Sequence, residues 1–454
     1  MTETAEPMPA DPTTANHTSA DPTTDLAATD YFKSGRLIRD PYAHWDALRD
    51  AGAVYQEQHH GVFMVTGYDE AQAVYRDPET FSSCNSVTGP FPGFPVPLEG
   101  DDVSDLIDAH RDELPFTDQL PSFDPPRHTQ HRGLLQRLFT PRRLQENEEA
   151  MWTIAHGQID TFLPPVGLTP GSTAPARCEF VNDFGAPTAM LVIADLLGVP
   201  EVDRGRFREQ LDAPSTSGKA GVEHSPLEFL YDTFREYIED RRANPRDDVL
   251  SRIALASFPD GSTPTVHDVM LLASNLFAAG QETTVRLLAY SMQKIGEDQD
   301  LQQWLRDDRS RIPGFIEECL RYESPIKGDF RLARRTTEVG GVTIPGGSVV
   351  MVLNGAANRD ESQFGCPHQF QPERTDAREH LAFGHGIHFC IGAALARAEG
   401  RITVETMLDR TANIAISEEH HGPAGERKYR FVPTYMLRGL AELHLELIPA
   451  GSGS

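Results

Sequence analysis

Cysteine is scarce in this 454-residue chain, and no two cysteines have the close spacing of a zinc or redox motif. The five that occur are Cys84, Cys178, Cys319, Cys366 and Cys390. An odd number without C-x-x-C spacing argues against a disulfide framework and favours a reducing compartment. We therefore expect a cytoplasmic protein.

Long apolar runs and a surplus of basic residues are also missing. The most apolar window, residues 271–288, is interrupted by polar and charged residues that include Asn275, Glu282 and Arg286, so we expect no membrane span. The chain has 41 Lys and Arg against 68 Asp and Glu, which gives a net charge of −27. Because nucleic acids and anionic membranes are polyanions, this charge argues against both as partners.

The two ends of the chain differ in composition from the rest. Residues 1–28 are rich in Thr, Asp, Ala and Pro and contain one pentapeptide, Ala-Asp-Pro-Thr-Thr, twice. Because this segment has too little apolar surface to fold, we expect a disordered tail there, and we expect a second flexible tail at 450–454. Hydrophobic residues make up 39% of the chain, enough for a large core, and we expect 29–449 to form one domain.

The apolar pattern between these tails predicts a mainly α fold with a small β region. Helical spacing dominates from residue 40 to about 322, apart from a hairpin predicted where 54–55 and 62–65 flank His59, His60 and Gly61. Residues 81–100, rich in Gly, Pro and Phe, predict a long functional loop. Strands are predicted at 342–344 and 348–352, on either side of a Pro-Gly-Gly turn, and within 431–445.

The segment Leu381–Gly392 carries the first candidate site. Glycines bracket a bend before Cys390, and a helix is predicted from Ala393 to Leu408. The start of that helix offers free N–H groups and a positive dipole end, an environment that favours the thiolate, which is the form of cysteine that binds metal. The same residues also allow an inert buried cysteine, or a zinc ion held by His385, His388 and Cys390.

A long central helix carries the second candidate site. Helical apolar spacing continues from Val266 to Ile295, a length of about 45 Å at about 1.5 Å per residue. Ala279, Gly280 and Thr283 share one face at its middle, and Leu276 and Leu287 extend that face. The Thr283 hydroxyl can bond back to the carbonyl of Ala279 or Gly280, which would open the helix locally to water and dioxygen. The alternative is a packing groove of small residues, with Glu282 exposed to solvent.

The pattern Phe383-Gly384-x-Gly386-x-His388-x-Cys390-x-Gly392 resembles the heme-binding signature of the cytochrome P450 superfamily, and the helix after it continues as in soluble bacterial members. The resemblance implies the cytochrome P450 fold, with the long central helix lying over the heme. It also implies that Cys390 is the axial ligand of the iron of heme b, that Phe383 packs beside the ring, and that His388 lies near a propionate.

The six residues from Ala279 to Thr284 are similar to the oxygen-activation motif of the same superfamily. The resemblance implies that Ala279 and Gly280 leave room for the heme and for O2. It further implies that Thr283 hydrogen-bonds dioxygen and that Glu282 relays protons from solvent, while the axial thiolate donates electron density toward the O–O bond.

Other basic and acidic residues fit the resemblance. Taken alone, Glu318 and Arg321 form an ordinary i,i+3 helix pair. Together with Arg374 they resemble the buried Glu-Arg-Arg network of the superfamily, which implies a structural role in fixing the cysteine loop. His128, Arg132 and Arg331 resemble the cations that hold the heme propionates.

The resemblance implies an enzyme that inserts one oxygen atom of O2 into a hydrophobic small molecule such as a terpenoid, a steroid or a fatty-acid-like compound. We expect Phe91, Phe94, Phe277, Ala278, Ile326 to Phe330, Tyr435 and Met436 to line its pocket. Because no flavin or iron–sulfur segment is recognised, electrons should come from a ferredoxin and a ferredoxin reductase.

We expect the electron donor to dock on a basic patch made of Arg132, Arg137, Arg142, Arg143, Arg397 and Arg401. Two rival functions are open. A peroxygenase driven by hydrogen peroxide would be expected to lack the Glu282–Thr283 pair, and a non-catalytic heme carrier or gas sensor would need no proton relay.

Overall fold

The computed structural model describes residue 26, residues 28–136, residue 139, and residues 141–163, 175–205 and 228–451. Most of the tail expected at 1–28 therefore lies outside the described residues, as do 452–454 of the second tail. The single domain expected for 29–449 stays a prediction.

The longer helices are α2 (Tyr42–Ala51), α3 (Tyr68–Arg76), α5 (Arg127–Gln136), α6 (Pro141–Ile159), α7 (Ala186–Leu197), α9 (Glu228–Ala243), α11 (Val266–Glu297), α12 (Gln299–Asp307), α13 (Ile312–Tyr322) and α15 (Ala393–Arg410). The shorter ones are α1 (Gly35–Arg39), α4 (Ser104–His110), α10 (Val249–Ala254), α14 (Asn354–Ala357) and α16 (Glu418–His421). The strands are β1 (Val54–Gln56), β2 (Phe63–Val65), β3 (Phe81–Ser82), β4 (Ala176–Glu179), β5 (Asp329–Ala333), β6 (Thr337–Val339), β7 (Val342–Ile344), β8 (Val349–Val352), β9 (Thr411–Ile416) and β10 (His444–Pro449).

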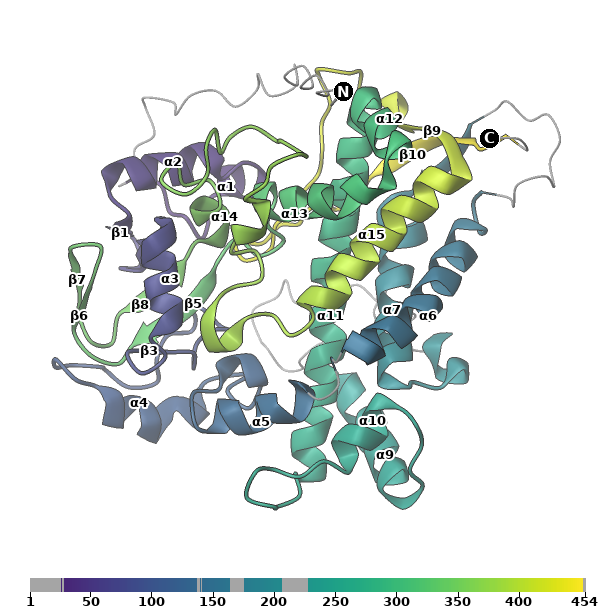
Figure 1. Cartoon of the computed structure of the whole chain (residues 1–454). Helices are drawn as coiled ribbons and strands as arrows, with labels where there is room; N and C mark the ends of the chain where they lie inside the picture. Colours follow the sequence, from purple (N-terminus) through teal and green to yellow (C-terminus); the bar gives the residue numbers. More distant parts are fainter. Residues whose placement is uncertain are drawn as a thin grey trace, which may run out of the picture.

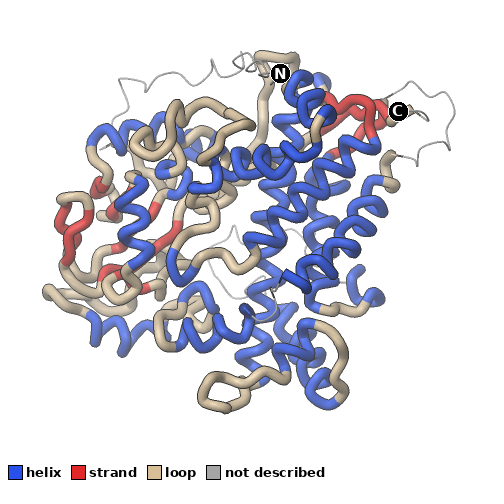
Figure 2. Tube along the Cα trace, in the orientation of Figure 1, coloured by secondary structure: helices blue, strands red, loops and turns tan. Residues whose placement is uncertain are grey.

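The strands gather in separate small sheets at the edges of a helical body (Figure 2). The largest sheet has the order β1-β2-β8-β5-β3, with β2 and β8 parallel, and so joins segments nearly 300 residues apart. A second sheet has the order β4-β10-β9, and β6 pairs with β7. The structure thus confirms the mainly α fold with a small β region.

Three of the predicted β segments can be compared with the sheets. The hairpin at 54–65 is confirmed, because β1 and β2 pair antiparallel with Val54 opposite Val65. The two runs around the Pro-Gly-Gly turn are both strands, but they do not pair with each other: β7 pairs with β6, whereas β8 lies between β2 and β5. The difference follows from burial, since Val350, Met351 and Val352 of β8 are completely buried and require neighbours on both edges.

The strand predicted within 431–445 is wrong for most of its length. This segment makes only isolated bridges, from Phe431 to Leu440 and from Ile326 to Leu437, and β10 begins at His444. Its alternating apolar residues are explained by packing, because Leu440 and Leu443 are buried in the main core without a continuous partner strand.

Helix α11 runs through the middle of the molecule, with α15 beside it (Figure 1). It begins at a capping box in which Thr265 and Asp268 satisfy each other's backbone N–H groups, so the predicted start at Val266 is confirmed. The helix continues without a break through Ala279–Thr284. No described helix is both long enough and apolar enough to cross a bilayer.

Candidate active site

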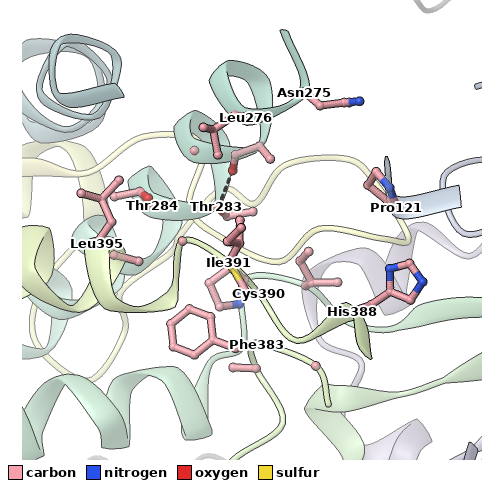
Figure 3. A pocket seen from close by; sticks show the side chains of 18 of the residues that line it. Pro121, Asn275, Leu276, Thr283, Thr284, Phe383, His388, Cys390, Ile391 and Leu395 are labelled. Carbon is pink, nitrogen blue, oxygen red and sulfur yellow. Dashed lines mark hydrogen bonds between the residues drawn. The ribbon is translucent and has the colours of Figure 1, made fainter. Parts of the chain in front are cut away.

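A cavity of about 300 Å³ separates α11 from the cysteine loop, residues 381–392. Eight of the ten predicted site residues line it: Arg132, Ala279, Gly280, Thr283, Arg331, Phe383, His388 and Cys390. Leu276 and Leu287, which extend the same face of α11, also line it. Figure 3 shows Cys390 between Thr283 of α11 and Phe383 of the loop. The cavity therefore brings together Thr283 and Cys390, which are 107 residues apart in the sequence (390 minus 283).

The cysteine loop owes its shape to glycine. Gly384 and Gly386 both have positive φ, at 66° and 69°, a region that favours glycine. A Cβ atom at Gly386 would lie 2.3 Å from the carbonyl oxygen of Tyr75 on α3, so only glycine fits there. The loop then turns back on itself, because the backbone N–H of Cys390 donates to the carbonyl of Phe383 at 2.9 Å. As a result the Cys390 side chain is exposed to the cavity.

The protonation of Cys390 differs from the expectation. Burial raises the pKa of its thiol, and this effect outweighs a hydrogen bond with the backbone of Gly392 and the charges of Arg132 and Arg397, which lower it. The expected helix start is present, since Gly392 is the N-cap of α15, but it does not by itself produce a thiolate.

Cations and histidines surround one end of the cavity. Arg132, on α5, donates to the carbonyl of Phe389, and Arg331, on β5, donates to the carbonyl of Phe330 at 2.7 Å. His388 lines the cavity, whereas His128 does not: it lies behind His388, with ring centroids 4.2 Å apart. Burial, followed by the neighbouring charge of Arg132, lowers the pKa of His128 to about 4, so this histidine is neutral at pH 7.

These groups fit an iron porphyrin. Within the described residues, both ring nitrogens of His128, Nε2 of His388 and Nε of Arg132 are buried without a hydrogen-bond partner. Each such group costs about 1–3 kcal/mol when left unpaired, so the site suits a ligand that brings acceptors such as carboxylates. A cysteine sulfur facing the same cavity supplies a ligand for iron. The residues present therefore match a ring with a central metal and acidic side groups.

The zinc alternative does not fit. Among the described residues, His385, His388 and Cys390 do not bring their ligand atoms close enough together to hold one ion. Instead, His385 Nε2 accepts a hydrogen bond from Nε of Arg76 on α3, at 3.1 Å.

The α11 wall of the cavity has the expected small residues. Ala279 is exposed although it lies in the middle of a buried helix, because its methyl group faces the cavity. The Thr283 hydroxyl donates to the carbonyl of Ala279 at 2.8 Å, the predicted back-bond (Figure 3). Glu282 does not line the cavity and is exposed, with Arg286 as its charged neighbour on the next turn.

A buried ion pair supports the cysteine loop from α13. Glu318 and Arg321 are both 0% exposed and bond in a bidentate manner, with two N–O distances of 2.7 Å. Arg374 lies 3.3 Å from Glu318, and the backbone N–H of Gln371 also donates to it, at 2.8 Å. The network expected from the resemblance is thus present, and it fixes the segment that leads into the cysteine loop.

A second buried network was missed by the sequence analysis. Glu317, the neighbour of Glu318, accepts from Nε of Arg397 on α15 at 2.7 Å and contacts Nε2 of His380 at 3.1 Å. Burial alone would raise the pKa of Glu317, but these two partners lower it to about 2. The guanidinium of Arg397 lies 4.7 Å from the ring centroid of Phe383. Glu317 therefore links α13 and α15 to the wall of the cavity.

The predicted basic patch is mostly neutralised. Arg142 and Arg143 pair with Glu146, Arg397 pairs with Glu317, and Arg401 pairs with Glu148 and Glu405. Arg132 points toward the cavity, and Arg137 lies outside the described residues. Two exposed cations near the cysteine loop were not selected by the sequence analysis: Arg76, which donates to His385, and Arg378, which lies 3.4 Å from Glu317.

Most of the expected pocket residues lie elsewhere. Of that set only Ile326 and Asp329 line the cavity. Phe277 is fully buried against Phe234 of α9, with ring centroids 6.0 Å apart. Phe91 and Tyr435 both pack edge-to-face against Phe32, outside the cavity.

One cavity residue had no signal in the sequence. Glu399, on α15, lines the cavity, is buried, and leaves Oε2 without a partner among the described residues. Burial raises the pKa of Glu399 well above its ordinary value, so the folded protein holds a proton that the unfolded chain releases above pH ~4.3. Folding stability is therefore lost as the pH rises above that value.

We expect Glu399→Gln to be more stable than the wild type at about pH 8, by about 1–3 kcal/mol, and the gain to shrink as the pH falls toward about 5. Glutamine keeps the shape of the side chain and has no proton to lose. Urea unfolding at both pH values measures the difference, with the exposed Glu379→Gln as control. Equal stability of the two proteins at both pH values would contradict the assignment of a protonated Glu399.

Comparisons with known proteins show the family of the chain. Residues 217–412 match the family model described as cytochrome P450. The cytochrome P450 monooxygenase PikC of Streptomyces venezuelae is 32% identical over 430 residues, covering 94% of each chain. The structure of Mycobacterium marinum cytochrome P450 CYP150A6, substrate-free, is 50% identical with a TM-score of 0.87, covering 94% of this chain and 100% of that one. CYP109E1 of Bacillus megaterium, solved with testosterone, is 25% identical with a TM-score of 0.74, covering 90% of this chain and 99% of that one. The chain therefore belongs to the cytochrome P450 family and is a monooxygenase of that heme-binding family.

Proposed function

We propose that this monooxygenase holds heme b through Cys390 and inserts one oxygen atom of O2 into an apolar small molecule. The observation that supports this most is the arrangement of the cavity: the Cys390 side chain forms one wall, and Ala279 and Thr283 of α11 form the opposite wall. When bound, the heme would supply the iron at which O2 is reduced and activated. The protein residues hold the ring, exclude water and deliver protons.

In this proposal Cys390 binds the iron as thiolate and donates electron density to it. In the same proposal the heme propionates are held by Arg132, Arg331 and His388. These residues surround the end of the cavity where buried N–H groups have no hydrogen-bond acceptor among the described residues. His128 supports the ring of His388 from behind. Phe383 packs beside the porphyrin, held in turn by Arg397.

In this proposal Thr283 and Glu282 deliver protons to the cavity. The Thr283 hydroxyl lines the cavity and donates its one hydrogen to the carbonyl of Ala279, so its oxygen is left to accept a hydrogen bond. Rotation of the hydroxyl away from Ala279 would let it donate that hydrogen into the cavity instead. Glu282 is exposed one residue earlier on α11 and takes protons from solvent.

The variant Thr283→Ala tests this role. We expect it to keep the heme and bind substrate, while product formed per NADH falls about tenfold and hydrogen peroxide rises, because dioxygen is reduced without the proton delivered in place. Product, NADH use and peroxide are measured in the same reaction.

The control is Ser291→Ala. Ser291 makes the same back-bond on the same helix, to Leu287 at 2.8 Å, but does not line the cavity. Coupling should be unchanged in this control. Full coupling in Thr283→Ala would remove Thr283 from the mechanism.

The substrate is proposed to be a terpenoid, steroid or fatty-acid-like compound. Apolar side chains supply most of the α11 side of the cavity and the facing elements: Leu120, Leu135, Ile193, Leu272, Leu276 and Ile326. The testosterone complex of the Bacillus megaterium relative is consistent with such a substrate. The location in the cytoplasm stays a prediction.

A ferredoxin, reduced by a ferredoxin reductase, is proposed as the electron donor. Phe389 precedes the iron-ligand position and is 41% exposed, with the exposed Arg76 and Arg378 near the same loop. An apolar contact beside exposed cations suits an acidic redox protein.

A further inference from the structure

The α11 wall of the cavity contains a polar side chain that has no hydrogen-bond partner among the residues the structure describes. Asn275 lies on α11 and lines the cavity beside Leu272 and Leu276 (Figure 3). Across the described part of the chain, its carboxamide takes part in no hydrogen bond. This residue is not required by the proton delivery or by the heme contacts described above.

Three other polar side chains of the cavity already have protein partners: the Ser86 hydroxyl donates to the carbonyl of Pro121 at 2.7 Å, the Thr283 hydroxyl donates to Ala279 at 2.8 Å, and Asp329 accepts from the Tyr75 hydroxyl at 2.5 Å. Glu399 also lines the cavity with Oε2 unpaired among the described residues, but it lies on α15 and not on the α11 wall. Asn275 is different because both its donor and its acceptor stay available to a molecule in the cavity.

An unpaired carboxamide in an apolar cavity discriminates between ligands. A purely apolar ligand would remove water from Asn275 and leave the amide without hydrogen bonds, which costs about 1–3 kcal/mol. A ligand with one carbonyl or hydroxyl oxygen placed at Asn275 replaces that water. Sites of this kind reject analogues that lack the polar group.

The helix sets the distance between this anchor and the reacting end of the cavity. Asn275 precedes Ala279 by four residues and Thr283 by eight, on one unbroken helix. At about 1.5 Å per residue these offsets correspond to about 6 Å and about 12 Å along the axis. A substrate whose oxygen is bound by Asn275 therefore places a different part of its skeleton beside the α11 turn above Cys390. The carbon at that point lies several bonds away from the bound oxygen.

We propose that Asn275 is the specificity-determining residue of this monooxygenase: it hydrogen-bonds the single carbonyl or hydroxyl oxygen of an otherwise apolar substrate and directs oxidation to a carbon about 6–12 Å from that oxygen. This inference rests on the proposed function, because it assumes that the cavity above Cys390 receives the substrate.

The test compares a rigid ketone with its matched hydrocarbon, 5α-androstan-3-one and 5α-androstane. Equilibrium dialysis against the heme-loaded protein measures binding without relying on turnover. The wild type should bind the ketone at least about tenfold more tightly, the value of one net hydrogen bond. Asn275→Leu should reduce the preference to less than about twofold, chiefly by weakening ketone binding.

Two further variants test whether a change in the shape of the cavity, and not the loss of the carboxamide, explains the result. Asn275→Gln keeps the carboxamide and should keep a preference for the ketone. Leu272→Met alters the same face of α11 without changing its polarity and should leave the preference intact. Products from the wild type should be oxidised far from the ketone, and those from Asn275→Leu should be spread over more positions.

Equal affinity of the wild type for the two compounds, or an unchanged preference in Asn275→Leu, would overturn the role of Asn275. The proposed function fails in a different way, through the absence of any oxidised product from compounds that do bind. Dialysis separates the two results, because it reports the ketone preference even when no product forms.

Discussion

Replacing Cys390 by serine is expected to lower product formation by at least about a thousandfold, or about 4 kcal/mol in activation free energy. Serine has nearly the same shape, so the loop held by Gly386 and the backbone bond to Phe383 should stay in place. An oxygen ligand at this position cannot donate the electron density that a thiolate donates. Product is measured with reductase, ferredoxin and NADH in excess.

The matched control for this prediction is Cys366→Ser. Cys366 is exposed and does not line the cavity, so its replacement should leave the rate unchanged. A Cys390→Ser protein that keeps more than a tenth of the wild-type rate would show that the sulfur is not the source of the activity.

Replacing Arg321 by methionine is expected to destabilise the fold by about 3–5 kcal/mol and to release the heme. The change removes the bidentate partner of Glu318 and leaves a carboxylate that is 0% exposed without its main cation. It also removes the donor to the backbone carbonyls of Asn358 and Pro367, at 2.9 and 3.0 Å, which hold the segment before the cysteine loop.

Urea unfolding, followed by fluorescence and by heme absorbance, measures both effects. Arg177→Ala serves as control, because it breaks an exposed ion pair with Glu419 and should cost less than about 1 kcal/mol. A loss of that same small size in Arg321→Met would mean that the buried pair contributes little to the fold.

The features predicted correctly from the sequence are those set by local rules. The start of α11 at Val266 was predicted from helical apolar spacing, and its cavity face from the spacing of Ala279 and Thr283. The bend before Cys390 follows from Gly384 and Gly386, which adopt positive φ. In each case the signal lies within a few neighbouring residues.

The features that were missed depend on contacts between distant segments. Nothing near Glu317 in the sequence indicates that its partners are Arg397 and His380 on other elements. For the same reason the arginines of the predicted basic patch were taken as free cations, although most of them have acidic partners. Sequence gives the sign of a charge but not the position of its neighbour.

The pocket predictions failed for a related reason. Phe277 follows Leu276 by one residue, which turns it about 100° around the helix and toward α9 instead of the cavity. Periodicity defines a face of a helix, but only the packing of other elements decides which face borders a cavity. Asn275, one residue earlier, is on the cavity side and gained significance only from its lack of a partner.

The most direct test of the central claim, that Cys390 binds heme iron as a thiolate, is the absorption spectrum of the carbon monoxide adduct of the reduced protein. We predict the strongly red-shifted Soret band of thiolate-ligated heme. A protein that stays colourless after reconstitution with hemin, or an adduct with the shorter-wavelength band of histidine-ligated heme, would contradict the account.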